Sequence, residues 1–176
     1  TNSCSWSFDP NAWHVTSAQQ QESGDRNAPQ FDHTRQTATG RYLLFNKAIL
    51  NPHKVFSINS TAKLEYNQTH CIAFWYYTNG KAAVFQLRLL LLLSKRPNIL
   101  IKQYRSEIET RRRWTPFETT IPVYSQLNET EFMLSIQYRP SSNESTTFAL
   151  DDLTVRPGEC GHRKQPWTYT FDRDVG

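Results

Sequence analysis

Short runs of β-branched, aromatic and other apolar residues, many alternating with polar residues, occupy most of the chain. Such runs are typical of β-strands, and turn-forming residues such as Arg139-Pro140 separate them. The pair Asn79-Gly80 stands between two apolar runs, which is the strongest short-range signal for a hairpin. The predicted strands cover residues 41–46, 54–59, 62–66, 71–78, 83–93, 98–104, 114–123, 131–139 and 147–156.

These predicted strands, with no convincing amphipathic helix among them, indicate an all-β protein whose antiparallel strands form a two-sheet sandwich. Residues 18–30 are polar and rich in glutamine, so we expect a loop there. The leucine-rich run 87–94 is far shorter than the roughly 20 residues that a membrane span requires, which predicts a buried strand. A length of 176 residues suits one domain with a substantial core.

Four N-x-Ser/Thr acceptor sequences indicate that the protein is extracellular, either secreted or on the cell surface. They begin at Asn59, Asn67, Asn128 and Asn143. No signal peptide begins at Thr1, so we expect the chain to be a mature or trimmed product. The formal net charge of +4 is compatible with acidic glycans or membrane surfaces and is weak evidence for either. An extracellular location disfavours nucleic acid as a partner.

Five motifs that follow one another in order carry a resemblance to a known family. They are "CSWSFDPNAWHV", "FDHTRQTATGRYLLF", "CIAFWYYTNG", a lone Trp114 before an apolar strand, and "FALDDLTVRPGEC". Together they resemble the MAM domain family, the extracellular module of meprins, neuropilins and mu-type receptor tyrosine phosphatases. The most diagnostic residues are Asp32, His33 and Thr34 with Gly40 and Tyr42, and then Ala149, Asp151, Asp152 and Leu153.

The resemblance implies a jelly-roll β-sandwich that mediates adhesion and oligomerisation without catalysis. We therefore expect protein partners, self-association among them. Two alternatives stay open: an accessory domain of a larger secreted enzyme or receptor, and a glycan-binding jelly roll, since lectins also use that architecture. The sequence holds no Gly-x-Ser-x-Gly elbow, His-Glu-x-x-His motif or phosphate loop, so no catalytic residue is expected.

The three cysteines are too few and too far apart for a zinc finger or ribbon. Within the resemblance, Cys71 and Cys160 are expected to form a disulfide that joins the start of a central strand to the end of the domain. Two free buried thiols are the alternative. Cys4 is then left over, because the residue that aligns with its family partner is Tyr169. We expect Cys4 to be a buried thiol or to form an intermolecular bond.

The resemblance also implies a structural calcium ion, because matching carboxylates hold a cation in several members of the family. The candidate ligands are Asp32, Asp151, Asp152 and Asp172. Calcium binds several oxygen ligands, and carboxylates that cluster without a cation repel one another. Successive side chains of a strand point to opposite faces, so Asp151 and Asp152 are not both expected to point inward. The alternative is that these aspartates cap turns and accept backbone amides.

The chain departs from the family in two places. Residues 94–113 form a longer and more basic stretch, which predicts either a site for sulfated glycan or acidic protein or an ordinary solvated loop. Its basic residues are Lys95, Arg96, Lys102, Arg105, Arg111, Arg112 and Arg113. In addition, the family's opening strand, of the form Cys-x-Phe-Glu, is absent before Thr1.

The terminal segment "WTYTFDRDVG", residues 167–176, has the shape of that missing strand. We predict a domain at 1–160, a linker at 161–166 and a terminal strand in which Trp167, Tyr169 and Phe171 face a core. The strand would complete its own domain, the next domain or a neighbouring subunit. A linker of six residues spans at most about 20 Å, which favours donation to a neighbour in a head-to-tail assembly. A disordered tail is the alternative.

Overall fold

The protein is described here by a computed structural model, which covers eleven stretches of the chain. They are residues 6–21, 26–49, 51, 53–65, 67–79, 85–93, 97–106, 112–123, 131–140, 147–161 and 168–169. Apart from one 3-10 turn, η1 (Lys47–Ile49), these residues form strands, turns and loops and no α-helix. No helix in this part of the chain is therefore long and apolar enough to cross a membrane.

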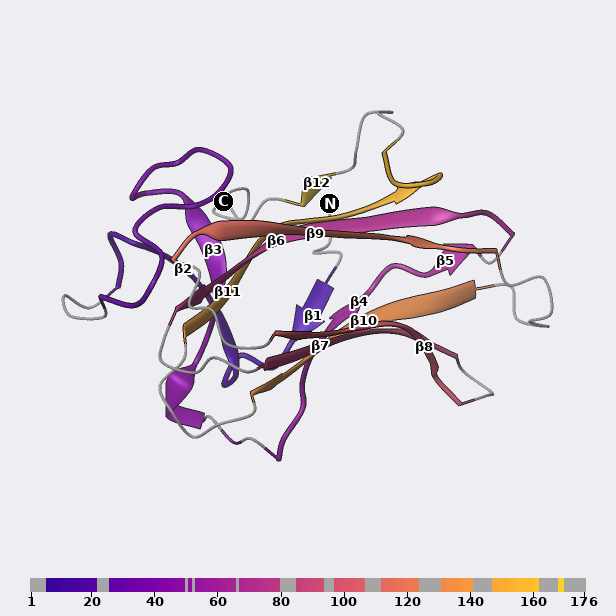
Figure 1. The fold of residues 1–176 in the computed structure, drawn as a ribbon, viewed down its shortest axis with the longest axis horizontal. Helices are drawn as coiled ribbons and strands as arrows, with labels where there is room; N and C mark the ends of the chain where they lie inside the picture. The colour runs from indigo at the N-terminus through magenta and orange to yellow at the C-terminus, as the bar shows by residue number, and fades with distance from the viewer. Residues whose placement is uncertain are drawn as a thin grey trace.

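Two antiparallel sheets face each other in a jelly-roll sandwich, which confirms the predicted all-β fold class (Figure 1). The first sheet, sheet A, has the order β1 (Trp6–Phe8), β4 (Phe56–Ser60), β10 (Glu131–Pro140), β7 (Phe85–Leu92) and β8 (Ile99–Ser106), with β5 (Leu64–Glu65) also pairing with β10. The second, sheet B, has the order β2 (Trp13–Ser17), β3 (Arg41–Phe45), β11 (Thr147–Pro157), β6 (His70–Asn79) and β9 (Trp114–Ile121), with β12 (Thr168–Tyr169) pairing with β11.

The core lies between the two sheets and follows the alternation of side chains along each strand. In β10 the residues at every second position, from Phe132 to Tyr138, are buried in the core cluster. The ring of Tyr138 stacks on Phe148 of the opposite sheet, with ring centroids 4.3 Å apart. The predicted buried strand 87–94 is confirmed in part by Leu89 and Leu91, which lie in the same core.

The predicted hairpin at Asn79-Gly80 is wrong. The strand before this pair, β6, lies in sheet B between β11 and β9, whereas the strand after it, β7, lies in sheet A between β10 and β8. The chain therefore crosses from one sheet to the other at this point. A local turn signal cannot report that both neighbouring strands already have partners from distant parts of the sequence.

Two short strands near the N-terminus were missed by the sequence patterns. Strands β1 and β2 hold the family motif "WSFDPNAWHV", in which a turn at Asp9–Ala12 interrupts the alternation. The amides of Ala12 and Trp13 both donate to the Asp9 carbonyl, which fixes this turn and carries the chain from sheet A to sheet B.

The terminal strand β12 pairs with β11 of the same chain. Thr168 lies opposite Thr154 and Tyr169 lies opposite Leu153, in antiparallel register. The glycines on the way back, Gly158 and Gly161, both have positive φ values, of 93° and 89°. The length argument for donation to a neighbour assumed that the linker must cross the sandwich, whereas pairing with the adjacent β11 requires no crossing. Trp167, Phe171 and Asp172 lie outside the described residues.

Candidate functional site

A bulge interrupts the pairing of β11 with β6. Asp151 pairs with Trp75 of β6 and Thr154 pairs with Ala73, so two residues of β11 stand opposite one of β6. Asp152, one of the two, has φ 51°, a left-handed conformation that aspartate tolerates better than most residues.

The bulge corrects the expected alternation of the two aspartates. Leu150 and Leu153, on either side, both point into the core. The side chains of Asp151 and Asp152, between them, therefore both lie on the face of sheet B that is turned away from the core. Both carboxylates contact one loop, at His33 and Thr34. The two aspartates do not both point inward, as expected, but the strict alternation behind that expectation fails here, because one inserted residue restores the inward direction three positions later rather than two.

Asp32 organises the loop that approaches the bulge. Its side chain is fully buried and accepts hydrogen bonds from the backbone amides of Arg35 (2.6 Å) and Thr37 (2.9 Å). The Asp32 amide in turn donates to the Thr37 carbonyl at 3.3 Å. Asp32 is thus a turn-capping residue, which is the alternative that the sequence left open for these aspartates.

His33 joins the loop to the bulge. Its backbone amide donates to Asp151 Oδ2 at 2.8 Å, and its ring Nδ1 lies 2.6 Å from Asp152 Oδ2. The imidazole stacks on the Trp75 ring, with centroids 3.7 Å apart and planes 17° apart. His33 therefore has a structural hydrogen-bonding role, because it joins the loop to both aspartates of the bulge.

The pKa of the Asp151 carboxyl is raised to about 7 in the fold, and burial is the largest cause of the shift. The negative charges of Asp152 and Asp32 raise this pKa further, and the backbone amides of His33 and Asp152 oppose the shift without cancelling it. A carboxyl group in this setting changes its charge near neutral pH, which few surface aspartates do.

The donor chemistry of the cluster suits calcium, because it offers three carboxylates and no sulfur. Both carboxylate oxygens of Asp32, Asp151 and Asp152 nevertheless already take part in hydrogen bonds with the loop or the bulge. Among the described residues, only Cys71, Glu118 and Cys160 bring three ligand atoms within 4.8 Å of one another, and two of these are disulfide-bonded. These residues alone do not define a calcium cage, and Asp172, the fourth candidate, lies outside the described residues.

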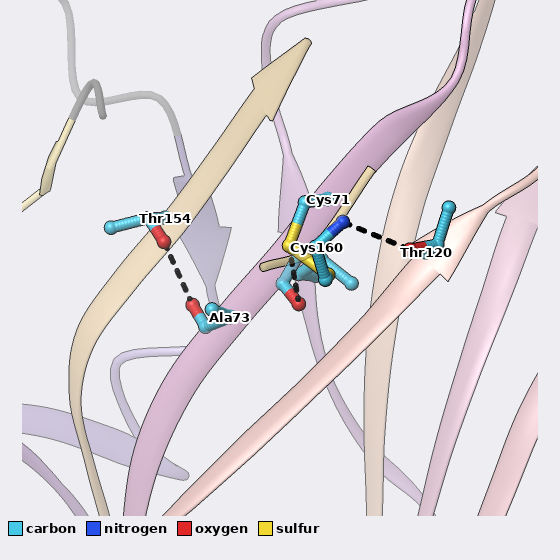
Figure 2. The surroundings of a disulfide bond; sticks show 6 residues. Cys71, Ala73, Thr120, Thr154 and Cys160 are labelled. Carbon is cyan, nitrogen blue, oxygen red and sulfur yellow. Dashed lines mark hydrogen bonds between the residues drawn. A yellow bond between two sulfur atoms is a disulfide. The ribbon is translucent and has the colours of Figure 1, made fainter. Parts of the chain in front are cut away.

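The predicted disulfide is confirmed. Cys71 of β6 and Cys160, which follows β11, form an S–S bond across a sequence separation of 89 residues (Figure 2). The Cys160 amide also donates to Thr120 Oγ1 of β9 at 3.0 Å. The bond therefore fixes one end of three adjacent strands of sheet B, β11, β6 and β9. Cys4 lies outside the described residues.

The loop 26–40 is held on sheet B by three side chains from three strands. Asn79 of β6 donates to the Asn27 carbonyl at 3.0 Å, and Tyr42 of β3 donates to the Pro29 carbonyl at 2.9 Å. Trp114 of β9 donates from Nε1 to the Phe31 carbonyl, also at 2.9 Å. Alternate carbonyls of the loop are thus bound to the sheet, and a small aromatic cluster beneath them comprises Tyr42, Tyr77 and Trp114.

Phe31 projects from this fixed loop, with 52% of its surface exposed. It is the most exposed of the large apolar residues in the described part of the chain. One feature of the sequence indicates such a role, namely an aromatic residue between Gln30 and Asp32 inside an otherwise polar stretch. The indole of Trp114 and the ring of Trp75 were likewise visible in the motifs but had no assigned contact.

The remaining predicted sites are only partly described. Asn59 lies in β4 and is half-buried, whereas Asn67 lies in an exposed turn between β5 and β6. Lys102 Nζ lies 5.2 Å from the centroid of the Phe117 ring, and Arg112 and Arg113 are exposed before β9. Nothing described brings these basic residues together. Outside the described side chains lie Asn128, Asn143, Lys95, Arg96, Arg105 and Arg111.

Comparison with known proteins identifies both a family and a fold. Residues 1–161 match the MAM domain family, described as MAM domain, meprin/A5/mu. Among solved structures, the CBM22-1-GH10 modules of Clostridium thermocellum xylanase 10B superpose with a TM-score of 0.52 at 14% identity, over 86% of this chain and 26% of that chain.

Two other structures superpose comparably. The enzymatically active domain of bacteriophage CBA120 tailspike protein 4 gives a TM-score of 0.52 at 9% identity, over 88% of this chain and 19% of that one. An arabinose-bound α-L-arabinofuranosidase gives 0.51 at 11% identity, over 84% and 23%. This chain thus spans about a quarter or less of all three structures, and identities this low show a shared sandwich fold alone.

Proposed function

Because this chain belongs to the MAM domain family, an extracellular module, we propose that it is a non-catalytic adhesion and assembly module that acts through protein–protein contacts. The observation that carries the proposal is the loop 26–40, which presents an exposed Phe31 from a backbone that is bound to three strands of sheet B. A rigid loop with an exposed aromatic residue has the character of an interface anchor, because little conformational entropy is lost on binding.

The proposed partner is a second copy of the chain, as expected for a module of homophilic adhesion. Phe31 would insert between the copies, with the polar loop residues around it forming a rim that excludes water. Strand donation is not included in this proposal, because β12 pairs with its own β11.

Calcium has a structural part in this proposal. The three described aspartates, Asp32, Asp151 and Asp152, accept the hydrogen bonds that tie the loop to the bulge. Burial raises the pKa of Asp151 most, and the negative charges of Asp152 and Asp32, which a bound cation would offset, raise it as well. A cation would therefore stiffen the base of the loop that carries Phe31.

The experiment compares self-association of the wild-type chain with that of Phe31→Ser by analytical ultracentrifugation and bead aggregation. The matched control is Val123→Ser, since Val123 is another exposed apolar residue, at 43%, and lies after β9 outside the loop. Loss of an anchor typically weakens binding by about tenfold or more. We expect that loss for Phe31→Ser only, with both variants melting near the wild-type temperature. Equal association of Phe31→Ser and wild type, or no association of the wild type, would overturn the proposal.

A further inference from the structure

A groove lies beside β4 where its edge partner β1 ends. The last residue of β1, Phe8, pairs with Ile58, so the earlier part of β4 has no partner on that side among the described residues. Residues 7–9 and 54–57 enclose a cavity of about 320 Å³ there. That volume is near the lower end of the range for small-ligand sites, about 300 to 1,000 Å³.

Asn59 forms part of the wall of this groove and begins an acceptor sequence, Asn59-Ser60-Thr61. Its backbone is fixed on both sides, by pairing with Ser7 of β1 and with Ser135 of β10. Its Oδ1 atom is buried and has no hydrogen-bond partner in the described part of the chain. An unpaired buried carbonyl is costly, so this side chain lacks a donor that a ligand would supply.

The groove offers both kinds of contact that a sugar ring requires. Lys54 lies over the Phe56 ring, with Nζ 5.4 Å from its centroid, and Ser7 and Ser57, whose side chains lie on the same face of sheet A as Asn59, also line the groove. Asp9 adds a carboxylate whose Oδ1 accepts from Asn11. A pyranose ring presents apolar C–H groups together with hydroxyl and acetamide groups, which match this mixture of aromatic, cationic and anionic surfaces.

We propose that the first N-acetylglucosamine of an N-linked glycan on Asn59 packs into this groove and stabilises the β1–β4 edge of sheet A. The acetamide or a hydroxyl of the sugar supplies the donor that Asn59 Oδ1 lacks. The inference rests on glycosylation at Asn59 and is independent of the contact through Phe31, which lies on the loop that covers sheet B. It distinguishes Asn59 from Asn67, which lies in an exposed turn and does not line the groove.

The test uses the chain produced in cells that attach only high-mannose glycans. Mass spectrometry first measures occupancy at Asn59 and Asn67. Endoglycosidase H then trims each glycan to a single N-acetylglucosamine, and melting temperatures are compared for trimmed wild type, Asn59→Gln and Asn67→Gln. Loss of the packed sugar should lower the melting temperature by about 2–4 °C in a domain of this length. We expect that decrease for Asn59→Gln, no shift for Asn67→Gln, and no shift on trimming wild type.

A second measurement separates sugar packing from an effect of the glutamine itself. In trimmed wild-type protein with labelled sugar, nuclear Overhauser effects should join the N-acetyl methyl group to side-chain protons of Ser7 and Ser57, which line the groove on the face that carries Asn59. Lys54→Ala should reduce both the Overhauser effects and the temperature difference between glycosylated and glycan-free protein. Absence of glycan at Asn59, or an attached sugar with no contact to Ser7 or Ser57 and no effect on melting, would overturn the proposal. Loss of self-association in Phe31→Ser would leave it unaffected.

Discussion

Gly40 lies directly against the carboxylate of Asp32. A Cβ atom added at Gly40 would come within 2.6 Å of both oxygens and of the carboxyl carbon of Asp32. Position 40 requires glycine because a side chain would have no space there. A left-handed backbone is not the reason, because the described glycines with positive φ are Gly158 and Gly161. The family motif that joins Asp32 to Gly40 is therefore a packing pair.

Gly40→Ala should destabilise the protein by roughly 1–3 kcal/mol, which is typical of overpacking at a rigid site. Urea unfolding of Gly40→Ala, Asp32→Ala and the double variant measures the coupling between the two positions. If the overlap is the cause, alanine at position 40 should cost less once the Asp32 carboxylate is gone. Additive effects of the two substitutions would contradict this explanation.

Loss of the Cys71–Cys160 bond should cost roughly 3–5 kcal/mol, because the bond closes a long loop in the unfolded chain. The double variant Cys71→Ser/Cys160→Ser should show this loss in chemical unfolding. Cys4→Ser is the control, since it leaves the bond intact. Peptide mapping without reduction should recover Cys71 linked to Cys160, and alkylation of both thiols without reduction would exclude the bond.

Asp151 should make the fold less stable as pH rises through the acidic range. Its pKa moves from an ordinary 3.8 to about 7 in the fold, in an environment that Asp152, Asp32 and His33 share. A raised pKa means that folding takes up a proton between these two values. This contribution is therefore fully present below about pH 4 and is lost as pH rises towards about 7, by up to about 1.4 kcal/mol per pH unit.

The measurement is urea unfolding from pH 4 to pH 8 in the presence of a chelator, for wild type and Asp151→Asn. Wild type should lose stability relative to the variant across this range and run parallel to it above pH 7. Glu118→Gln, which removes an exposed carboxylate of sheet B, should follow the wild-type profile. Parallel curves for wild type and Asp151→Asn between pH 4 and pH 7 would show that Asp151 is ionised throughout.

The strands of the sandwich could be predicted because alternation and β-branched composition are local properties of sequence. The boundaries of β3 (Arg41–Phe45) and β10 (Glu131–Pro140) differ from the predicted runs by one residue. The Asn79-Gly80 crossing could not be predicted, since strand partners are chosen by the whole sandwich.

The candidate site was predictable in its residues and not in its geometry. Asp32, Asp151 and Asp152 were identified, but a strand run gives no sign of the bulge that turns both Asp151 and Asp152 towards one loop. Phe31 was missed because exposure of an aromatic residue depends on how Trp114 and its neighbours fix the loop backbone.

Removal of calcium should lower the melting temperature if Asp32, Asp172 and one or both of Asp151 and Asp152 bind the ion. A ligand that binds only the folded state stabilises it by about 2.7 kcal/mol at a concentration 100 times its dissociation constant. The effect of chelator should be larger at pH 8 than at pH 5, because a proton on Asp151 competes with the cation and its pKa is about 7 without the ion. Asp172→Asn should remove the response to chelator, whereas Asp9→Asn, at a turn between β1 and β2, should keep it. Identical melting curves with and without excess chelator at pH 8 would mean that no bound calcium stabilises the fold. Hydrogen bonds such as those from His33, Arg35 and Thr37 would then hold these carboxylates without an ion.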